Sequence, residues 1–255
     1  MEAVILAGGY GTRISEESVF RPKPMIEIGG KPILWHIMKI YSHYGINDFI
    51  VCCGYKSYYI KEYFMNYFMH SSDLNIDLAN NQVEYHNSSS EPWKLKLIDT
   101  GLDTMTGGRL KYVRDHIKGE RFHMTYGDGV SNVDLDSLEK YHIEKNASVT
   151  LTGVKPPGRF GQLKIENGMV DSFREKPEGD GAYINGGFFV VEKKIIDNID
   201  GPQTVWEQEP LQEEAKKGQL AVYKHEGFWQ PMDTLREKNS LERLWSSGEA
   251  PWKVW

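Results

Sequence analysis

The chain has 255 residues, of which 40% are hydrophobic and 26% charged, a composition typical of one large globular domain or of a domain with a subdomain. Its net charge of −6 argues against nucleic-acid binding, and it has no apolar run of about 18 residues, so we expect no membrane contact. The only two cysteines, Cys52 and Cys53, are adjacent, and strand-forming residues begin too early for a signal peptide, so we expect reduced thiols and a cytoplasmic location.

The first predicted element is a short buried strand, Val4–Leu6, followed by a loop of small residues, Ala7-Gly8-Gly9-Tyr10-Gly11. Such a loop lets a ligand approach the backbone and gathers N–H groups that suit phosphate oxygens. Thr12 and Arg13 close the loop, and Lys23 in the RPKPM segment is expected to return to the same edge. This arrangement predicts a triphosphate site.

Two other interpretations of this loop are a plain tight turn and a fragment of the dinucleotide fingerprint. The fingerprint would require glycine or alanine at position 14, where the chain has Ile14. The loop also lacks the GK[ST] ending of a P-loop. A site for a nucleoside triphosphate is therefore favoured.

Strands and helices alternate through the first half of the chain. The expected elements are the helix Ile33–Tyr44, the strand Asp48–Cys53, the helix Lys56–Phe68, the helix Thr106–Ile117 and the strand Arg121–Tyr126. This order predicts an α/β fold with a doubly wound, mostly parallel, Rossmann-like sheet. Ligands of such sheets bind beyond the carboxyl ends of the strands.

Residues 69–98 do not fit a simple crossover between strands. They contain polar loops around two short strand-like segments, Gln82–His86 and Lys94–Ile98. We interpret residues 69–98 as an inserted β-rich arm, which would make a subunit contact or cover the nucleotide.

The second half is richer in strands. The expected elements are the strand Ala147–Val154, a hairpin at Gln162–Phe173, the strands Tyr183–Val191 and Leu220–Lys224, and helices near Glu207–Lys217 and Thr234–Ser247. No linker separates the two halves, which predicts a single domain over residues 1–255.

Two aspartates stand at predicted strand ends. Asp128 lies in the YGDG segment and Asp233 in the WQPMD segment. Either one alone is more typical of a turn or a helix N-cap. Together they could hold one Mg²⁺, which prefers oxygen ligands and keeps water and phosphate oxygens in its shell.

Three further segments of the second half have the composition of a sugar-phosphate site. In Glu175-Lys176-Pro177 the carboxylate suits sugar hydroxyls and the ammonium suits an anion, although a charged hairpin end explains the residues as well. Asn185-Gly186-Gly187 interrupts a strand, which hints at close approach of a ligand to the backbone. Arg159-Phe160-Gly161 forms another window of small residues.

The segments AGGYGTR, RPKPM, GDG, EKP, NGGF and WQPMD, in this order, resemble the sugar nucleotidyltransferase family over essentially the whole chain. Details such as PPGRFG, INGGFFV, WEQEPL and FWQPMDTLR are similar to its branch that uses CTP and glucose 1-phosphate. The resemblance implies an enzyme that transfers a cytidylyl group from CTP to α-D-glucose 1-phosphate. The product, CDP-glucose, would feed the synthesis of CDP-deoxysugars and of O-antigen-type lipopolysaccharide.

The resemblance also implies roles for individual residues. Residues 1–130 would bind the nucleotide through Leu6, Ala7, Gly8, Gly9, Gly11, Thr12, Arg13, Lys23, Thr104, Arg109 and Gly127. Residues 131–255 would bind the sugar phosphate through Gly161, Glu175, Lys176, Asn185 and Gly186. The catalytic residues would be Arg13, Lys23, Asp128 and Asp233, with Mg²⁺ bound by the two aspartates.

A homo-oligomer, trimeric or hexameric, is the expected assembly. The family resemblance favours it, and Trp245, Trp252 and Trp255 near the C-terminus need a surface on this chain or on a neighbour. Three other functions remain as alternatives: the same chemistry with UTP or dTTP, a catalytically inactive nucleotide-sugar sensor subunit, and an oxidoreductase with a Rossmann fold.

Overall fold

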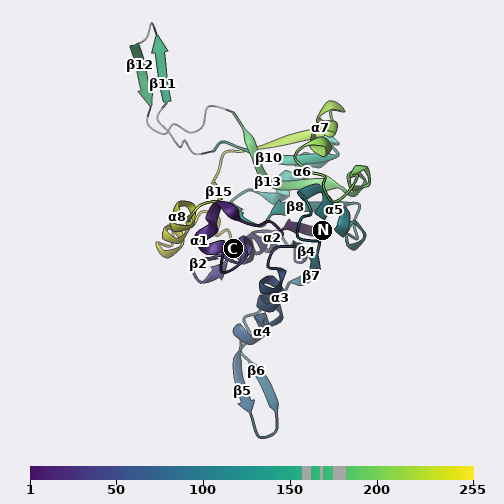
Figure 1. Ribbon diagram of the computed structural model, residues 1–255, viewed down its shortest axis with the longest axis vertical. Coiled ribbons are helices and arrows are strands. Elements are labelled where there is room, and N and C mark those ends of the chain that lie inside the picture. The colour runs from purple at the N-terminus through teal and green to yellow at the C-terminus, as the bar shows by residue number, and fades with distance from the viewer. Residues whose placement is uncertain (157–161, 167–168, 175–181) are drawn as a thin grey trace.

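The structure is a computed structural model that describes residues 1–156, 162–166, 169–174 and 182–255. Its centre is a seven-stranded sheet in the order β14-β10-β13-β8-β1-β4-β7 (Figure 1). The strands are β1 (Glu2–Leu6), β4 (Asp48–Cys53), β7 (Lys94–Asp99), β8 (Arg121–Tyr126), β10 (Val149–Val154), β13 (Ile184–Glu192) and β14 (Leu220–His225). Only the pairs made by β13 in this sheet are antiparallel, which confirms the prediction of a mostly parallel sheet.

Helices cover both faces of the sheet because successive side chains of a strand point to opposite faces. On β1, Ala3 and Ile5 pack into one hydrophobic core with helix α2 (Ile33–His43). Val4 and Leu6 pack into a second core with helix α5 (Thr106–Val113). The continuous apolar run of β1 is therefore what places it at the centre of the sheet.

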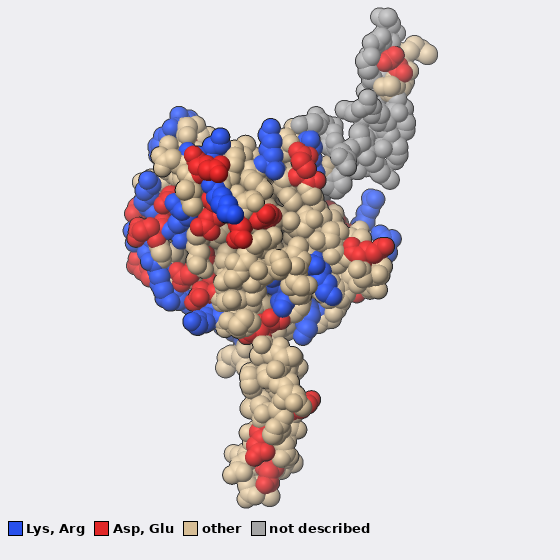
Figure 2. Space-filling model, turned by 180° about the vertical axis from the view of Figure 1, so that it is seen from behind, with Lys and Arg blue, Asp and Glu red and all other residues tan. Residues whose placement is uncertain are grey.

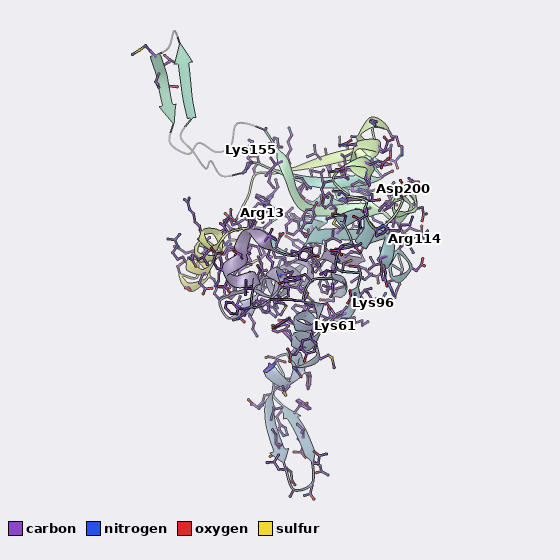
Figure 3. All side chains as sticks on the ribbon, viewed as in Figure 1. Arg13, Lys61, Lys96, Arg114, Lys155 and Asp200 are labelled. Carbon is purple, nitrogen blue, oxygen red and sulfur yellow. The ribbon has the colours of Figure 1, made fainter. Side chains whose placement is uncertain are left out.

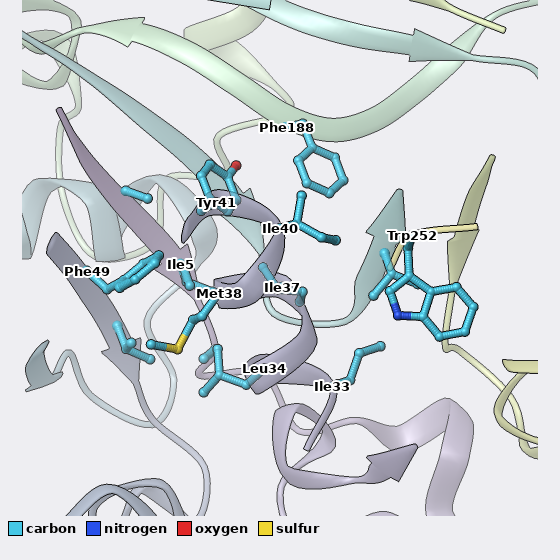
Figure 4. Packing of buried hydrophobic residues seen from close by; sticks show 14 of the residues in the cluster. Ile5, Ile33, Leu34, Ile37, Met38, Ile40, Tyr41, Phe49, Phe188 and Trp252 are labelled. Carbon is cyan, nitrogen blue, oxygen red and sulfur yellow. The ribbon is translucent and has the colours of Figure 1, made fainter. Parts of the chain in front are cut away.

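Helix α2 begins directly after Pro32 and is followed by Gly45 with φ of +76°, as the sequence predicts. Figure 4 shows its apolar side chains between the sheet and the C-terminal Trp252. The ring of Tyr41 stacks on Phe188 at a centroid distance of 6.0 Å. This packing couples helix α2 to strand β13.

The C-terminal tryptophans pack on their own chain. Trp252 is fully buried, and its indole Nε1 donates a hydrogen bond to Nδ1 of His36 at 3.3 Å. Trp245 and Trp255 pack on the same core. The sequence left open whether these indoles pack on this chain or on a neighbouring subunit, and the structure shows that they pack on this chain.

The boundary predicted for the inserted arm is wrong at its C-terminal end. The segment Lys94–Ile98 belongs to β7, which pairs in parallel with β4 and forms an edge of the central sheet. Leu95 and Leu97 pack against the core of the domain, which explains the placement. The separate arm is the hairpin of β5 (Asp73–Asp77) and β6 (Gln82–His86).

Several helices differ from the prediction in their bounds. The predicted helix Lys56–Phe68 is divided at Asn66 into α3 (Ser57–Met65) and α4 (Tyr67–His70), and α5 gives way at Val113 to a 3₁₀ turn. Helix α6 (Leu135–Lys145) was missed, although Asp134 caps it by accepting a hydrogen bond from Ser137 N at 2.9 Å. The remaining helices are α1 (Ser15–Ser18), α7 (Glu209–Lys216) and α8 (Leu235–Ser246).

Four two-stranded ladders complete the fold. The hairpin predicted at Gln162–Phe173 is confirmed by β11 (Gln162–Glu166) and β12 (Met169–Arg174), although its turn lies outside the described residues. The other ladders pair β5 with β6, β2 (Glu27–Ile28) with β3 (Lys31–Pro32), and β9 (Gly129–Ser131) with β15 (Trp229–Pro231). Among the residues that the structure describes, none of the helices is both long and apolar enough to span a membrane.

Candidate active site

A cavity of about 510 Å³ opens at the carboxyl ends of β1 and β8. Its walls are the loop after β1, the turn after β8 and the segment from Leu102 to Thr106. Figure 3 shows Arg13, at the rim, on the side of the molecule away from the β5–β6 hairpin. The volume is within the range of small-molecule sites, and the position is the one that a doubly wound sheet offers to a ligand.

The small residues of the loop after β1 have identifiable steric reasons. A Cβ atom at Gly8 would lie 2.1 Å from Nη1 of Arg109, so no side chain fits there. Gly11 has φ of +67°, and a Cβ atom there would lie 3.1 Å from Cβ of Lys23. The loop can therefore follow the cavity wall closely only with glycine at these positions.

The guanidinium group of Arg109 is buried and holds two cavity walls together. Nη1 donates to the carbonyl oxygens of Cys53 and Gly101 and to Oγ1 of Thr100, at 2.7 to 3.2 Å. Nη2 donates to the carbonyl oxygens of Gly8 and Leu102 at 3.1 and 3.2 Å. Arg109 therefore ties the glycine loop to the segment that carries Thr104.

The pairing of β9 with β15 brings the two predicted aspartates together although they are far apart in sequence. Asp128 directly precedes β9, and Pro231 at the end of β15 pairs with Gly129. The amide of Met232 donates to the carbonyl oxygen of Asp128 at 2.8 Å. Asp233 follows, immediately before Thr234, the N-cap of α8.

Lys23 lies between the two carboxylates. Its Nζ is 2.6 Å from Oδ2 of Asp128 and 2.6 Å from Oδ1 of Asp233. Burial of Lys23 disfavours its charged form, but the two carboxylates outweigh burial and raise the pKa of the lysine. Arg13 approaches from the solvent side, with Nη1 2.6 Å from Oδ2 of Asp233 and a side chain that is 75% exposed.

The two carboxylates fit a hard cation that retains other oxygen ligands. Both approach the single Nζ atom of Lys23, so they are close enough to share one ion. Within the described part of the chain, no group of three or more His, Cys, Asp or Glu residues could hold a metal. An ion bound here would therefore complete its shell with water and substrate oxygens, as Mg²⁺ does in phosphate-transfer sites.

The structure brings all eleven residues predicted to bind the nucleotide around this cavity, which they line together with Asp128. Asp233 reaches the site through Lys23 and Arg13. Of the predicted sugar-phosphate residues, Gly161, Glu175 and Lys176 lie outside the described residues. Asn185 donates a hydrogen bond to Oη of Tyr126 at 3.2 Å, and the carbonyl oxygen of Gly186 accepts one from Trp229 at 2.7 Å.

Sequence reasoning missed part of the cavity wall. The lining residues that it did not assign are Tyr10, Pro24, Leu102, Asp103, Met105, Thr106, Tyr126 and Gln203. Tyr126 offered a signal, because it ends β8 immediately before the GDG turn. Tyr10 lies within the predicted loop, but nothing in the local sequence indicates that its hydroxyl donates to Asp103, 93 positions away, at 2.6 Å.

Comparisons with known proteins show the family of the chain. The family model described as nucleotidyl transferase matches residues 2–232. The chain is 59% identical over its full length to the full-length glucose-1-phosphate cytidylyltransferase of Salmonella typhi, and 47% identical, again over both full lengths, to a probable glucose-1-phosphate cytidylyltransferase of Bacillus subtilis.

The solved structure of HddC from Yersinia pseudotuberculosis is similar in fold, with a TM-score of 0.67 and 23% identity over 96% of this chain and 99% of that one. Nucleotidyltransferases of this kind generally use a divalent metal ion. The resemblance of the sequence motifs to the sugar nucleotidyltransferases is thereby confirmed. The chain belongs to the nucleotidyl transferase family, within its glucose-1-phosphate cytidylyltransferase branch.

Proposed function

We propose that the protein transfers the cytidylyl group of CTP to α-D-glucose 1-phosphate and releases pyrophosphate and CDP-glucose. The observation that carries the proposal is the group of Lys23, Arg13, Asp128 and Asp233 at the rim of the cavity, in a chain 59% identical to enzymes named for this reaction. The group combines the two kinds of charge that phosphate transfer needs: cationic side chains that bind phosphates, and carboxylates that bind a metal ion.

The reaction needs no protein nucleophile, because the phosphate of the sugar is already anionic. One of its oxygens attacks the α-phosphorus of CTP, and the bond from that phosphorus to the pyrophosphate oxygen breaks in line with the attack. The protein contributes position and charge. In our account Arg13, which is exposed at the rim, binds the nucleotide phosphates and the departing pyrophosphate, and Lys23 bridges the reacting phosphates.

We propose Mg²⁺ as the divalent ion, held by Asp128 and Asp233. The support is chemical: two carboxylates at a phosphate site suit a hard cation that keeps water in its shell. When bound, the ion neutralises charge on the phosphate oxygens. Lys23, which lies between the two aspartates, would bind the phosphates of the substrates.

The same proposal assigns the two substrates to different halves of the chain. Residues 1–130 would hold CTP, and residues 131–255 would hold the sugar phosphate with Asn185, Gly186 and the undescribed Gly161, Glu175 and Lys176. The cytoplasmic location and the role of CDP-glucose in polysaccharide synthesis stay predictions.

The product identifies the reaction. The protein incubated with CTP, α-D-glucose 1-phosphate and Mg²⁺ should form CDP-glucose and pyrophosphate in equal amounts, measured by chromatography and mass spectrometry. Binding of CTP without pyrophosphate release would favour the inactive sensor instead. Tight binding of NAD(P) without such turnover would favour the oxidoreductase.

We also propose that the protein forms a homo-oligomer, trimeric or hexameric, through the β5–β6 hairpin. Leu74 pairs with Tyr85 and Ile76 with Val83, so the four apolar side chains share one face of the hairpin. All four are at least 37% exposed. Figure 2 shows this part of the molecule as an extension with few charged residues, and an isolated hairpin is at best marginally stable in water. A second copy of the chain supplies an apolar face of matching size and chemistry.

Light scattering tests this assembly. Ile76→Lys should reduce the measured mass toward that of one chain, because it places a charge in the apolar face. Asn75→Lys, on the polar face of the same strand, is the matched control and should keep the assembly. An intact protein that is monomeric and fully active would contradict the proposal. A deletion of residues 69–98 is unsuitable, since it would remove β7 from the central sheet.

A further inference from the structure

Glu207, which lies between β13 and α7, joins two polar side chains of the cavity wall. The hydroxyl of Tyr126 donates to Oε1 of Glu207 at 2.5 Å, and Oγ1 of Thr106 donates to Oε2 at 2.7 Å. Tyr126 and Thr106 both line the cavity, while Glu207 stands behind them. Each carboxylate oxygen of Glu207 therefore fixes one residue that faces the ligand.

The bond to Glu207 determines whether the Tyr126 hydroxyl can donate or accept a second hydrogen bond. Its hydroxyl hydrogen is used by Glu207, so its oxygen is left as an acceptor, and Nδ2 of Asn185 donates to it at 3.2 Å. Oδ1 of Asn185 accepts from the amide of Gly187 at 2.9 Å. These two bonds fix the orientation of the Asn185 amide, and no other residue that the structure describes accepts a hydrogen bond from its second N–H.

The surroundings keep this arrangement in place. The ring of Tyr126 packs edge to face on Phe189 at 5.9 Å, and a Cβ atom at Gly187 would lie 3.1 Å from Cδ2 of that ring. Burial, together with the charge of Glu207, raises the pKa of Tyr126, so its hydroxyl stays a donor at neutral pH. On the other side, Oγ1 of Thr106 accepts from the amide of Trp206 at 2.9 Å.

We infer that Glu207 is a positioning residue for the sugar phosphate: it holds the Tyr126 hydroxyl, and through it the Asn185 amide, in the orientation in which the amide donates its second N–H to the sugar phosphate. The inference rests on the proposed function, because that function is what makes Asn185 a sugar-phosphate ligand. Glu207 itself touches no reacting atom. It acts through Tyr126 and Asn185, and its bond to Thr106 ties this pair to the wall that carries α5.

Steady-state kinetics of the full chain test the inference. Tyr126→Phe and Glu207→Ala should each raise KM for α-D-glucose 1-phosphate about tenfold, the effect of losing one hydrogen bond, and change KM for CTP much less. The KM of the double variant for α-D-glucose 1-phosphate should not exceed that of the more affected single variant, because both changes break the same chain of hydrogen bonds from Glu207 through Tyr126 to Asn185. Glu207→Gln keeps an acceptor for Tyr126 and should stay close to the wild type.

Glu209→Ala is the matched control, since this glutamate is exposed two residues further on. Equal increases in both KM values, effects that multiply in the double variant, or a Glu207→Gln variant as impaired as Glu207→Ala would overturn the inference. Thermal unfolding of each variant separates these results from loss of fold. A wild-type protein without turnover would contradict the proposed function instead, and calorimetric affinities for α-D-glucose 1-phosphate would then provide the same comparison.

Discussion

Nζ of Lys23 lies 2.6 Å from Oδ2 of Asp128. The same nitrogen lies 2.6 Å from Oδ1 of Asp233, so the lysine occupies the point where the two carboxylates converge. Together with Arg13, which pairs with Asp233 from the solvent side, Lys23 therefore balances the charge of the two carboxylates. A metal ion and a triphosphate would have to separate them, which makes the binding of the two ligands interdependent.

This arrangement predicts competition between Lys23 and a divalent ion. Lys23→Met should bind Mn²⁺, used as a spectroscopic probe in the absence of nucleotide, at least about tenfold more tightly than the wild type, because two charge-assisted hydrogen bonds no longer oppose the metal. Electron paramagnetic resonance measures the free ion directly. Lys39→Met is the control, since Lys39 on α2 pairs with Glu91 and neither residue lines the cavity. Unchanged Mn²⁺ affinity in the Lys23 variant would argue against the competition.

Replacing Asp128 by Asn should reduce turnover at least about 10²-fold, the scale of losing one strong electrostatic contact to the transition state. The fold should be nearly unchanged, since the amide has the shape of the carboxyl. Asp136→Asn, at an exposed position on α6, is the control. Near-normal turnover of the Asp128 variant in saturating Mg²⁺ would mean that Asp128 is only a turn residue.

Local sequence signals predict the bounds of several helices and strands. The bounds of β4 and β8 were predicted to the residue, and α2 to within one, because each is an apolar run with a clear start and stop. The segment Lys94–Ile98 was misassigned because its surroundings are polar and only the pairing with β4 makes it part of the sheet.

The candidate site divides in the same way. The residues of the glycine loop follow from composition alone, but the contacts of Arg109 do not, since they join carbonyl groups from separate loops. The bond from Tyr126 to Glu207 spans 81 positions of sequence; Glu207 lies in the WEQEPL segment, but nothing in that segment indicates its contact with Tyr126. Contacts of this kind are determined by the tertiary fold and not by the local sequence.

The C-terminal tail should contribute strongly to stability. Trp252 is fully buried and stacks on Phe228 at 5.6 Å, so Trp252→Ala should lower the free energy of unfolding by about 3–5 kcal/mol. Urea denaturation measures this change. Tyr58→Ala, at a side chain that is 67% exposed, is the control and should cost far less. A loss below about 1 kcal/mol for the Trp252 variant would show that the tail packs loosely.

His36 should make the fold sensitive to acid. Burial lowers the pKa of His36 to about 4, although the Ile28 carbonyl and Glu242 act in the opposite direction. The contribution of a neutral histidine is complete above the unfolded pKa of about 6.5 and is lost as the pH falls from there toward 4. Between pH 7 and pH 5 the wild type should therefore lose about 2 kcal/mol more than His36→Gln. Equal losses in urea denaturation of both proteins would contradict this.

The central claim is that this cavity selects CTP for transfer to α-D-glucose 1-phosphate. The most direct measurement is kcat/KM for pyrophosphate release with CTP, UTP, dTTP, ATP and GTP in turn, at fixed α-D-glucose 1-phosphate and Mg²⁺. Our account predicts the highest value for CTP, with CDP-glucose as the product. A clear preference for UTP or dTTP would contradict the assignment of the base while leaving the phosphate chemistry intact, and no pyrophosphate with any of the five would contradict the account as a whole.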